Sequence, residues 1–194
     1  MLPFASIDFY LLALLLVLSL HAVKAVAGRS VSLGQALFGI SVLYAVVYFP
    51  KPWQLLLFTV YQGLLTWLLL FRWRRLHTLV GSLLLALPMI LVKLEWNVDL
   101  IGFAGISYIT FRCIQVYLDG ELLRDRYRIQ DLVPFLLFPP SLLAGPIDRY
   151  ERFKSDLDAG WTRINPAALL AGWELIVVGL LHKFVLAELV DRYW

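Results

Sequence analysis

The feature that most constrains this chain is its series of long apolar runs, separated by short polar stretches. A helix needs about 20 apolar residues to cross a bilayer. Apolar residues make up 61% of the chain and charged residues only 16%, whereas a soluble domain is nearer half apolar and a quarter charged. The pattern excludes a disordered chain, a nucleic-acid-binding tail and an ordinary cytosolic enzyme. It predicts that the lipid bilayer surrounds the chain.

The runs predict an all-α integral membrane protein with about six transmembrane helices, forming a single membrane domain over residues 1–194. Prolines, basic clusters and a short acidic loop mark the ends of the helices. The spans are expected at about residues 9–27, 33–49, 53–71, 78–94, 100–118 and 167–189. The first run lacks the positively charged start of a cleaved signal peptide, so we expect it to remain as a span.

The basic residues between the runs predict the orientation of the chain. The loops after the first, third and fifth spans hold most of the arginines, and the other loops hold few basic residues. Because basic loops stay on the cytoplasmic side of a membrane, we expect a multi-pass protein with its N-terminus outside. The net charge of +3 therefore reports orientation more than ligand choice.

Residues 131–146 do not fit the spanning pattern. Their apolar part, residues 132–144, is too short to cross the bilayer and contains Pro134, Pro139 and Pro140. Irregular backbone is tolerated at membrane depth only where protein or a water-filled cavity surrounds it. The sequence therefore predicts a re-entrant or interfacial segment on the inner face.

The fifth run carries a polar stripe. Its members recur at the spacing of one helical face: Tyr108, Arg112, Gln115 and Asp119. Ionisable groups are costly inside a membrane and by default indicate a functional site. Arg112 and Asp119 are two turns apart, so each is expected to find its partners elsewhere. The stripe indicates either an interhelical hydrogen-bond network or the lining of a cavity.

No complete catalytic constellation is visible. His21, His77 and His182 have no serine, cysteine or carboxylate at the spacing of a triad or a metal site. Cys113 is the single cysteine, so no disulfide forms within the chain. Glycine-rich phosphate loops and hydrolase motifs are also absent from the sequence. The residues alone predict a membrane cavity with no bound metal or cofactor.

Two stretches are more specific than composition. The first is Gly105-Ile-Ser-Tyr-Ile-Thr-Phe-Arg112. The second contains Phe135 and Phe138-Pro139 and ends in Ala144-Gly-Pro-Ile-Asp-Arg-Tyr-Glu-Arg-Phe153. Together they resemble the membrane-bound O-acyltransferase (MBOAT) family over roughly residues 50–190. The Ile-Asp-Arg-Tyr-x-Arg-Phe continuation favours the D-alanyl transfer branch over the alginate-type O-acetyltransferase branch.

The resemblance implies a bacterial cytoplasmic-membrane enzyme that moves an acyl group, here D-alanyl. The implied donor is a thioester on the phosphopantetheine arm of a small acidic carrier protein in the cytosol. The implied acceptor is a hydroxyl of an envelope glycopolymer such as teichoic or lipoteichoic acid. A polysaccharide O-acetyltransferase, or a non-catalytic scaffold that docks a carrier protein, are the alternatives. A transporter half is disfavoured because no inverted repeat is visible.

The resemblance also suggests roles for residues of this chain. Tunnel-lining or substrate-lining candidates are Tyr108, Arg112, Gln115, Asp119, Gly145, Pro146, Asp148 and Arg149. Carrier-docking candidates are Arg124, Arg126, Arg128 and Arg152, because a basic patch steers an acidic partner. The family's catalytic histidine lies in a later segment and matches none of the histidines here. The resemblance thus implies an N-terminal half that is inactive without the missing C-terminal half.

Overall fold

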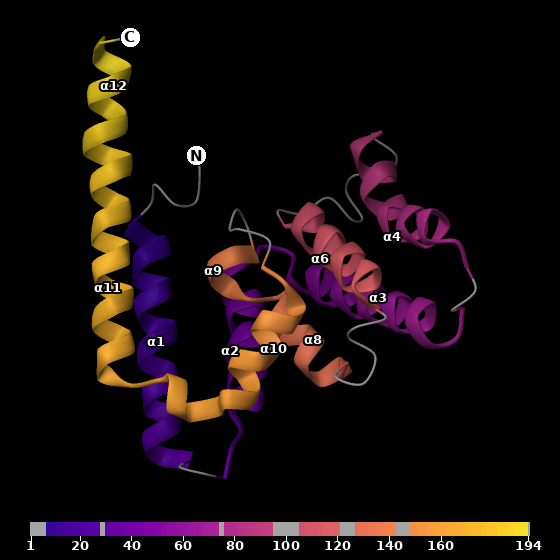
Figure 1. Ribbon diagram of the computed structural model, residues 1–194, viewed down its shortest axis with the longest axis horizontal. Coiled ribbons are helices and arrows are strands. Elements are labelled where there is room, and N and C mark those ends of the chain that lie inside the picture. The colour runs from indigo at the N-terminus through magenta and orange to yellow at the C-terminus, as the bar shows by residue number, and fades with distance from the viewer. Residues whose placement is uncertain are drawn as a thin grey trace. The chain divides into compact units, whose positions relative to one another are not determined.

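The computed structural model describes residues 7–27, 30–73, 76–94, 105–120, 127–142 and 148–193 (Figure 1). Every regular element in these ranges is a helix, which confirms the predicted all-α class for the described part of the chain. Four helices coincide with the first four expected spans: α1 Ile7–Ala27, α2 Leu33–Tyr48, α3 Pro52–Phe71 and α4 Thr78–Lys93. Helix α6 (Ile106–Leu118) covers the later part of the fifth.

Two of the described helices are long and apolar enough to cross a membrane, Pro52–Phe71 and Pro166–Arg192. The apolar helices Leu14–Val26, Leu33–Tyr48 and Thr78–Lys93 are shorter. A helix of 16 residues is about 24 Å long, whereas the hydrocarbon core of a bilayer is about 30 Å thick. Such a helix crosses only with help from its flanking residues or a thinner bilayer. The number of six crossings therefore stays a prediction.

The fifth helix begins later than the sequence indicated. Its start was expected near residue 100, but residues 100–104 lie outside the described residues and α6 begins at Ile106. Gly105 has φ of 100°, in the left-handed region, and an α-helix cannot run through that conformation. An added Cβ on Gly105 would also lie 3.1 Å from the carbonyl oxygen of Leu142. Glycine is therefore required here both by its own backbone and by a neighbouring one.

Local signals in the sequence explain where α2 and α3 begin and end. Ser32 accepts a hydrogen bond from the backbone N–H of Gln35, whose side chain accepts one from the N–H of Ser32. This reciprocal capping box satisfies two N–H groups that have no partner inside the helix. At the other end α2 stops before Pro50, and α3 starts with Pro52 in its first position, where a proline costs no hydrogen bond.

The proline-broken segment forms two short helices, α8 (Ile129–Leu136) and α9 (Pro139–Leu142). The side chains of Leu132, Leu136 and Leu142 are fully buried. The segment packs against α2, α3 and α6, and Gly63 of α3 leaves room for the Leu132 side chain, which would lie 3.5 Å from an added Cβ. The described residues of the segment thus lie in the protein core, and its re-entrant or interfacial position in the membrane stays a prediction.

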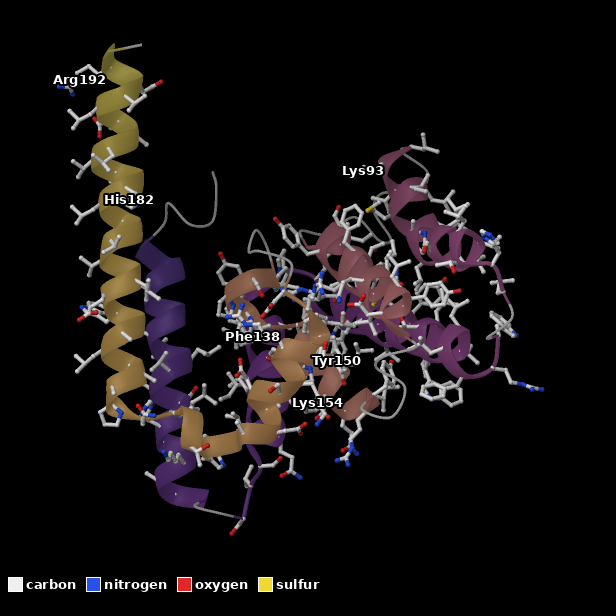
Figure 2. The ribbon with its side chains drawn as sticks, viewed as in Figure 1. Lys93, Phe138, Tyr150, Lys154, His182 and Arg192 are labelled. Atoms are coloured by element: carbon white, nitrogen blue, oxygen red, sulfur yellow. The ribbon has the colours of Figure 1, made fainter. Side chains whose placement is uncertain are left out.

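Helix α10 (Tyr150–Ala159) was not expected from the sequence. Its buried residues are Tyr150, Lys154 and Leu157, at the i, i+4, i+7 spacing of one helical face. Figure 2 labels Tyr150 and Lys154 on this helix. Tyr150 and Phe153 of α10 join the core to which α3, α6 and α8 contribute, and the opposite face of α10 carries exposed charged residues.

A buried polar contact joins α3, α4 and α6. The Nε2 atom of Gln62 donates to the carbonyl oxygen of Leu85 at 3.0 Å and to Oγ1 of Thr110 at 3.4 Å. Pro88 lies inside α4 and has no N–H to offer the carbonyl four residues earlier. The Gln62 amide therefore brings a donor to the turn of α4 in which the proline weakens the backbone hydrogen bonding.

Residues Ala159–Trp194 form a second compact unit, separate from the unit Met1–Asp158. It contains the 3₁₀ helix η2 (Gly160–Arg163), α11 (Pro166–Leu181), the π-helical η3 (His182–Leu186) and α12 (Ala187–Tyr193). Asn165 caps α11 by accepting a hydrogen bond from the N–H of Ala168 at 2.8 Å. The expected helix at 167–189 is thus present, with one wide π-helical turn at its middle.

Candidate functional site

Arg112 of α6 is the largest fully buried side chain among the described residues, with 1% of its surface exposed. Its Nη1 atom donates to the carbonyl oxygens of Phe135 at 2.7 Å and Leu136 at 3.1 Å. Its Nη2 atom donates to the carbonyl oxygen of Ser141 at 3.2 Å and also to the Ser141 hydroxyl. The guanidinium carbon lies 5.3 Å from the centre of the Phe135 ring, a cation–π distance.

The positions of two prolines explain why Arg112 bonds these carbonyls. In a continuous α-helix the carbonyls of Phe135 and Leu136 would accept from the N–H groups of residues 139 and 140. Both of those residues are prolines, and proline has no N–H. Nη1 of Arg112 supplies the two missing donors. The arginine thus takes the place of backbone hydrogen bonds at the break between α8 and α9.

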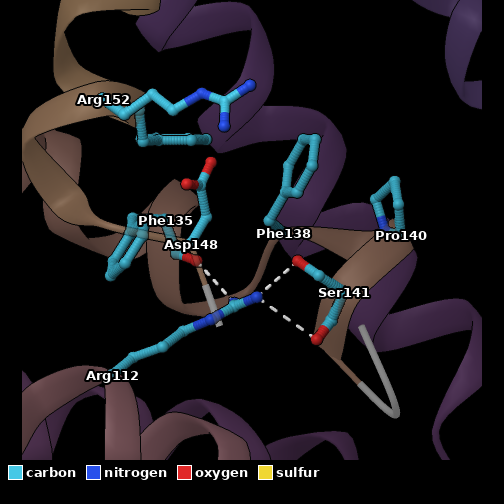
Figure 3. A pocket seen from close by; sticks show the side chains of 8 residues that line it. Arg112, Phe135, Phe138, Pro140, Ser141, Asp148 and Arg152 are labelled. Atoms are coloured by element: carbon cyan, nitrogen blue, oxygen red, sulfur yellow. Dashed lines mark hydrogen bonds between the residues drawn. The ribbon is translucent and has the colours of Figure 1, made fainter. Parts of the chain in front are cut away.

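A cavity of about 480 Å³ opens beside the Arg112 guanidinium. Its lining comes from α6, α8, α9, the residues before α10 and α10 itself: Arg112, Phe135, Phe138, Pro140, Ser141, Asp148, Arg152 and Phe153. Figure 3 shows the guanidinium at one wall with its hydrogen bonds to Phe135 and Ser141, and Asp148 and Arg152 further along. We call this space the Arg112 cavity. Its volume is within the range of small-molecule sites.

The walls of the Arg112 cavity are mostly aromatic. The Phe135 and Phe153 rings lie 5.3 Å apart, and the Phe138 and Phe153 rings lie 5.6 Å apart in an edge-to-face arrangement. Behind them, Tyr150 packs edge-to-face on Phe135 at 5.4 Å. Burial raises the pKa of Tyr150 to about 12, so its hydroxyl stays protonated at neutral pH and lies 3.4 Å from the Arg128 backbone N and O.

The structure divides the predicted polar stripe into two contacts. Arg112 reaches α8 and α9, as described above, whereas Gln115 accepts a hydrogen bond from the Tyr150 N–H at 3.4 Å. Gln115 also donates to Asp119, one turn further on the same helix. The expectation of a partner on another element thus holds for Arg112, while the described partner of Asp119 lies on its own helix. Tyr108 is half-buried and does not line the cavity.

The other predicted site residues fall into three groups. Asp148 and Arg152 line the Arg112 cavity. Arg128 and Arg149 are exposed and do not line it, and the Arg149 N–H donates to the Asp148 carboxylate at 2.9 Å. The remaining predicted residues lie outside the described part of the chain: Arg124, Arg126, Gly145 and Pro146.

Sequence reasoning missed Lys154, which joins α10 to α8. Its Nζ atom lies 3.1 Å from the Asp131 carboxylate and also contacts Asp158 one turn along α10. Burial alone would lower the pKa of Lys154, but the hydrogen bonds and charges of Asp158 and Asp131 outweigh burial and raise it above its ordinary value. The sequence analysis assigned no role to Lys154 beyond its positive charge. Its spacing from Tyr150 and Leu157 was the signal for its burial.

The chain is similar to bacterial proteins named teichoic acid D-alanyltransferase. It is 38% identical over 99 residues to the one from Bacillus subtilis (strain 168), a match that covers 50% of this chain and 25% of the relative. It is 37% identical over 116 residues to the one from Streptococcus thermophilus, covering 56% and 28%. It is 36% identical over 102 residues to the one from Lacticaseibacillus rhamnosus, covering 50% and 24%.

The matched part of the chain thus spans about a quarter of the length of these relatives. No protein-family model matches the chain, and no solved structure matches it significantly. The relatives confirm the similarity to the D-alanyl transfer branch that the sequence motifs indicated. Their names identify them as transferases.

Proposed function

We propose that the chain is the N-terminal part of a multi-pass membrane O-acyltransferase of the MBOAT type that transfers D-alanine to teichoic acid. The observation that carries this proposal is the 36–38% identity to three teichoic acid D-alanyltransferases over half of the chain. The apolar helices and the Arg112 cavity support it, because transfer to an envelope polymer needs a membrane-embedded site that a donor can enter.

In the proposed reaction the donor is a D-alanyl thioester on the phosphopantetheine arm of a cytosolic carrier protein. The thioester carbon–sulfur bond breaks, an ester bond forms between the D-alanyl carbonyl carbon and a hydroxyl oxygen of teichoic acid, and the hydroxyl proton ends on the released thiol. This chain contributes shape and access. The family resemblance implies a proton-transferring histidine that corresponds to none of His21, His77 and His182.

The cytoplasmic side of the proposed protein is basic and the expected carrier is acidic. Arg128 and Arg149 are exposed, and in the sequence they lie on either side of the lining residues between Phe135 and Asp148. Complementary charge speeds the encounter of two proteins and fixes their orientation. We therefore assign Arg128 and Arg149 to carrier docking, together with Arg124 and Arg126, which precede them in the sequence.

Binding of the carrier protein tests this assignment. The 194-residue chain would be placed in nanodiscs, and the affinity for a D-alanyl carrier protein would be measured by biolayer interferometry at low and moderate salt. We expect the double variant R128A/R149A to weaken binding about tenfold, the effect of losing roughly 1.4 kcal/mol, and the loss to shrink as salt screens the charges. The matched control is R72A, which removes an exposed arginine at the end of α3. Equal binding by the double variant and the control would refute the docking assignment.

Transfer itself is tested by complementation. The chain would be reconstituted in vesicles with the Bacillus subtilis relative from which the matched 99 residues have been deleted. D-alanine esters on added teichoic acid would then be counted by radiolabel. We expect esters with both pieces present and none with either alone. Esters formed from an acetyl-loaded carrier but not from a D-alanyl carrier would refute the D-alanyl proposal in favour of O-acetyl transfer.

A further inference from the structure

Helix α10 forms one wall of the Arg112 cavity, through Arg152 and Phe153 (Figure 3). No other described helix packs its backbone closely along α10, so side chains attach this helix to the rest of the first unit. Two of them are aromatic: Tyr150 packs edge-to-face on Phe135, and Phe153 lies against Phe135 and Phe138. A segment with few buried contacts opens more readily than the core behind it. The α10 wall can therefore move while the core stays folded.

The first residue of α10 is fixed more firmly than the wall residues that follow it. Tyr150 is fully buried. Its backbone N–H donates to Oε1 of Gln115 on α6 at 3.4 Å, and its hydroxyl lies 3.4 Å from the backbone of Arg128. By contrast, Arg152 is exposed and Phe153 is only half-buried. The geometry thus provides a pivot at Tyr150 and a freer stretch of helix beyond it.

One ion pair fastens the part of α10 beyond this pivot. The Nζ atom of Lys154 lies 3.1 Å from the Asp131 carboxylate of α8, and both side chains are largely buried. Lys154 also contacts Asp158, one turn further along α10 itself. The contact with Asp131 joins two helices, whereas the contact with Asp158 joins two residues of one helix. Of the two contacts, only the one with Asp131 can hold α10 in place.

Both members of this ion pair keep a favourable neighbour when the pair opens. Lys154 retains Asp158, which moves with it on α10. Asp131 lies in the first turn of α8, and its Oδ1 atom would lie 3.5 Å from a Cβ added to Gly34 in the first turn of α2. A carboxylate is stabilised near the N-terminal end of a helix. Breaking a buried ion pair is costly chiefly when it leaves a charge uncompensated, so this pair can open at a lower cost.

We propose that α10 is a movable wall of the Arg112 cavity that swings about Tyr150, and that the ion pair between Lys154 and Asp131 holds it closed. Outward movement of α10 withdraws Arg152 and Phe153, so the cavity widens on this side. Lys154 does not line the cavity; it is a positioning residue that determines where the wall stands. The movement requires neither acyl transfer nor a particular ligand, so this inference can fail while the proposed function stands.

The distance between spin labels on α8 and α10 tests the proposal. The labels are attached at Q130C and S155C, because both positions are exposed, in a C113A background that removes the single thiol of the chain. Dipolar electron paramagnetic resonance of the 194-residue chain in nanodiscs gives the distribution of distances between the two helices. We expect a short distance to dominate in this parent chain. D131N should raise the fraction of longer distances by about threefold or more, because even a partly exposed ion pair is worth about this factor.

Three further variants separate the ion pair from a general loss of stability. D158N removes the other carboxylate that contacts Lys154 and should leave the short distance dominant, because the pair with Asp131 remains. K154R keeps the positive charge and should also keep the short distance. If D131N does not fold, K154M takes its place, since methionine keeps an apolar stem without the charge, and longer distances again support the proposal. Distances in D131N or K154M that match the parent, or an increase in D158N as large as in D131N, would overturn it.

Discussion

Replacing Arg112 with alanine is the sharpest test of how the break between α8 and α9 is stabilised. The substitution leaves the carbonyl oxygens of Phe135 and Leu136 without a donor, because the prolines that follow cannot supply one. Both residues are fully buried, so only water that enters through the adjoining cavity could take the place of the guanidinium. A buried polar group left unpaired costs about 1–3 kcal/mol, which for the two carbonyls amounts to about 2–6 kcal/mol.

The midpoint of thermal unfolding reports this loss. For a chain of this size a loss of about 4 kcal/mol lowers the midpoint by roughly 8–16 °C. Cys113 is fully buried and is the single thiol of the chain, so a maleimide dye that fluoresces on reaction follows unfolding in detergent. The control R128A removes the same charge from an exposed side chain and should stay within about 0.5 kcal/mol of the wild type. A change of 1 kcal/mol shifts the midpoint of a chain of this size by ~2–4 °C. An R112A midpoint within about 2 °C of the R128A midpoint would therefore correspond to a loss of at most about 1 kcal/mol and would refute the reasoning.

The same reasoning predicts that Arg112 is energetically coupled to the two prolines. In the background P139A/P140A the backbone regains two N–H groups, so the carbonyls before the break have an alternative donor. R112A should then cost less than it does beside the native prolines, by the 0.5–3 kcal/mol typical of residues that share a partner. Additive losses in this cycle would contradict the assignment of Arg112 as a substitute donor.

Two further predictions concern stability elsewhere in the first unit. G105A should lower the free energy of unfolding by about 1–2 kcal/mol or more, since a left-handed backbone disfavours any side chain. G39A in the middle of α2, where an added Cβ meets nothing within 4 Å, should instead raise the free energy of unfolding by about 0.5–1 kcal/mol. Equal effects of the two substitutions in a dye-based melt would contradict this. Because the folded-state pKa of Lys154 is raised by its carboxylate partners, the stability that this residue contributes is present below the ordinary pKa of 10.5 and is lost as the pH rises above the folded value. The thermal-unfolding midpoint, followed by circular dichroism, should therefore differ between wild type and K154Q by a constant amount from neutral pH towards 10.5, and this difference should shrink at higher pH. A difference that grows with pH would exclude the ion pair with Asp131 as its source.

Helix positions followed from the sequence because apolar runs, prolines and capping residues act locally. The proline pair near residue 51 and Asn165 before Pro166 marked helix ends within a residue or two of the observed ones. The start of α6 was the exception. Gly105 takes a left-handed conformation that the sequence alone does not reveal, and an apolar run continues across it.

Only part of the candidate site was predictable from the sequence: Arg112 and Asp148 line the cavity, whereas its aromatic walls and the contacts of Arg112 were not predicted. The spacing of Arg112 on a polar stripe correctly indicated that it faces the protein interior. Its partners could not be inferred because they are mostly backbone carbonyls, which every residue possesses. What decides them is the absence of N–H groups at Pro139 and Pro140, a fact visible in the sequence but meaningful only once α6 is known to pass beside the break. Lys154 was missed because a basic residue in a stretch predicted to be cytoplasmic already has a sufficient explanation as a topology signal.

The contacts of Arg112 also impose an order on biosynthesis. Its acceptors lie 23 to 29 residues later in the chain, and at about 5–20 residues per second the ribosome needs roughly 1–6 s to add them. During that interval the Arg112 guanidinium on α6 lacks its final hydrogen-bond acceptors, and a charged group without partners is costly in the hydrocarbon core of a bilayer. If α6 is a membrane span, as the sequence predicts, its stable insertion therefore waits until the segment up to residue 142 has been made.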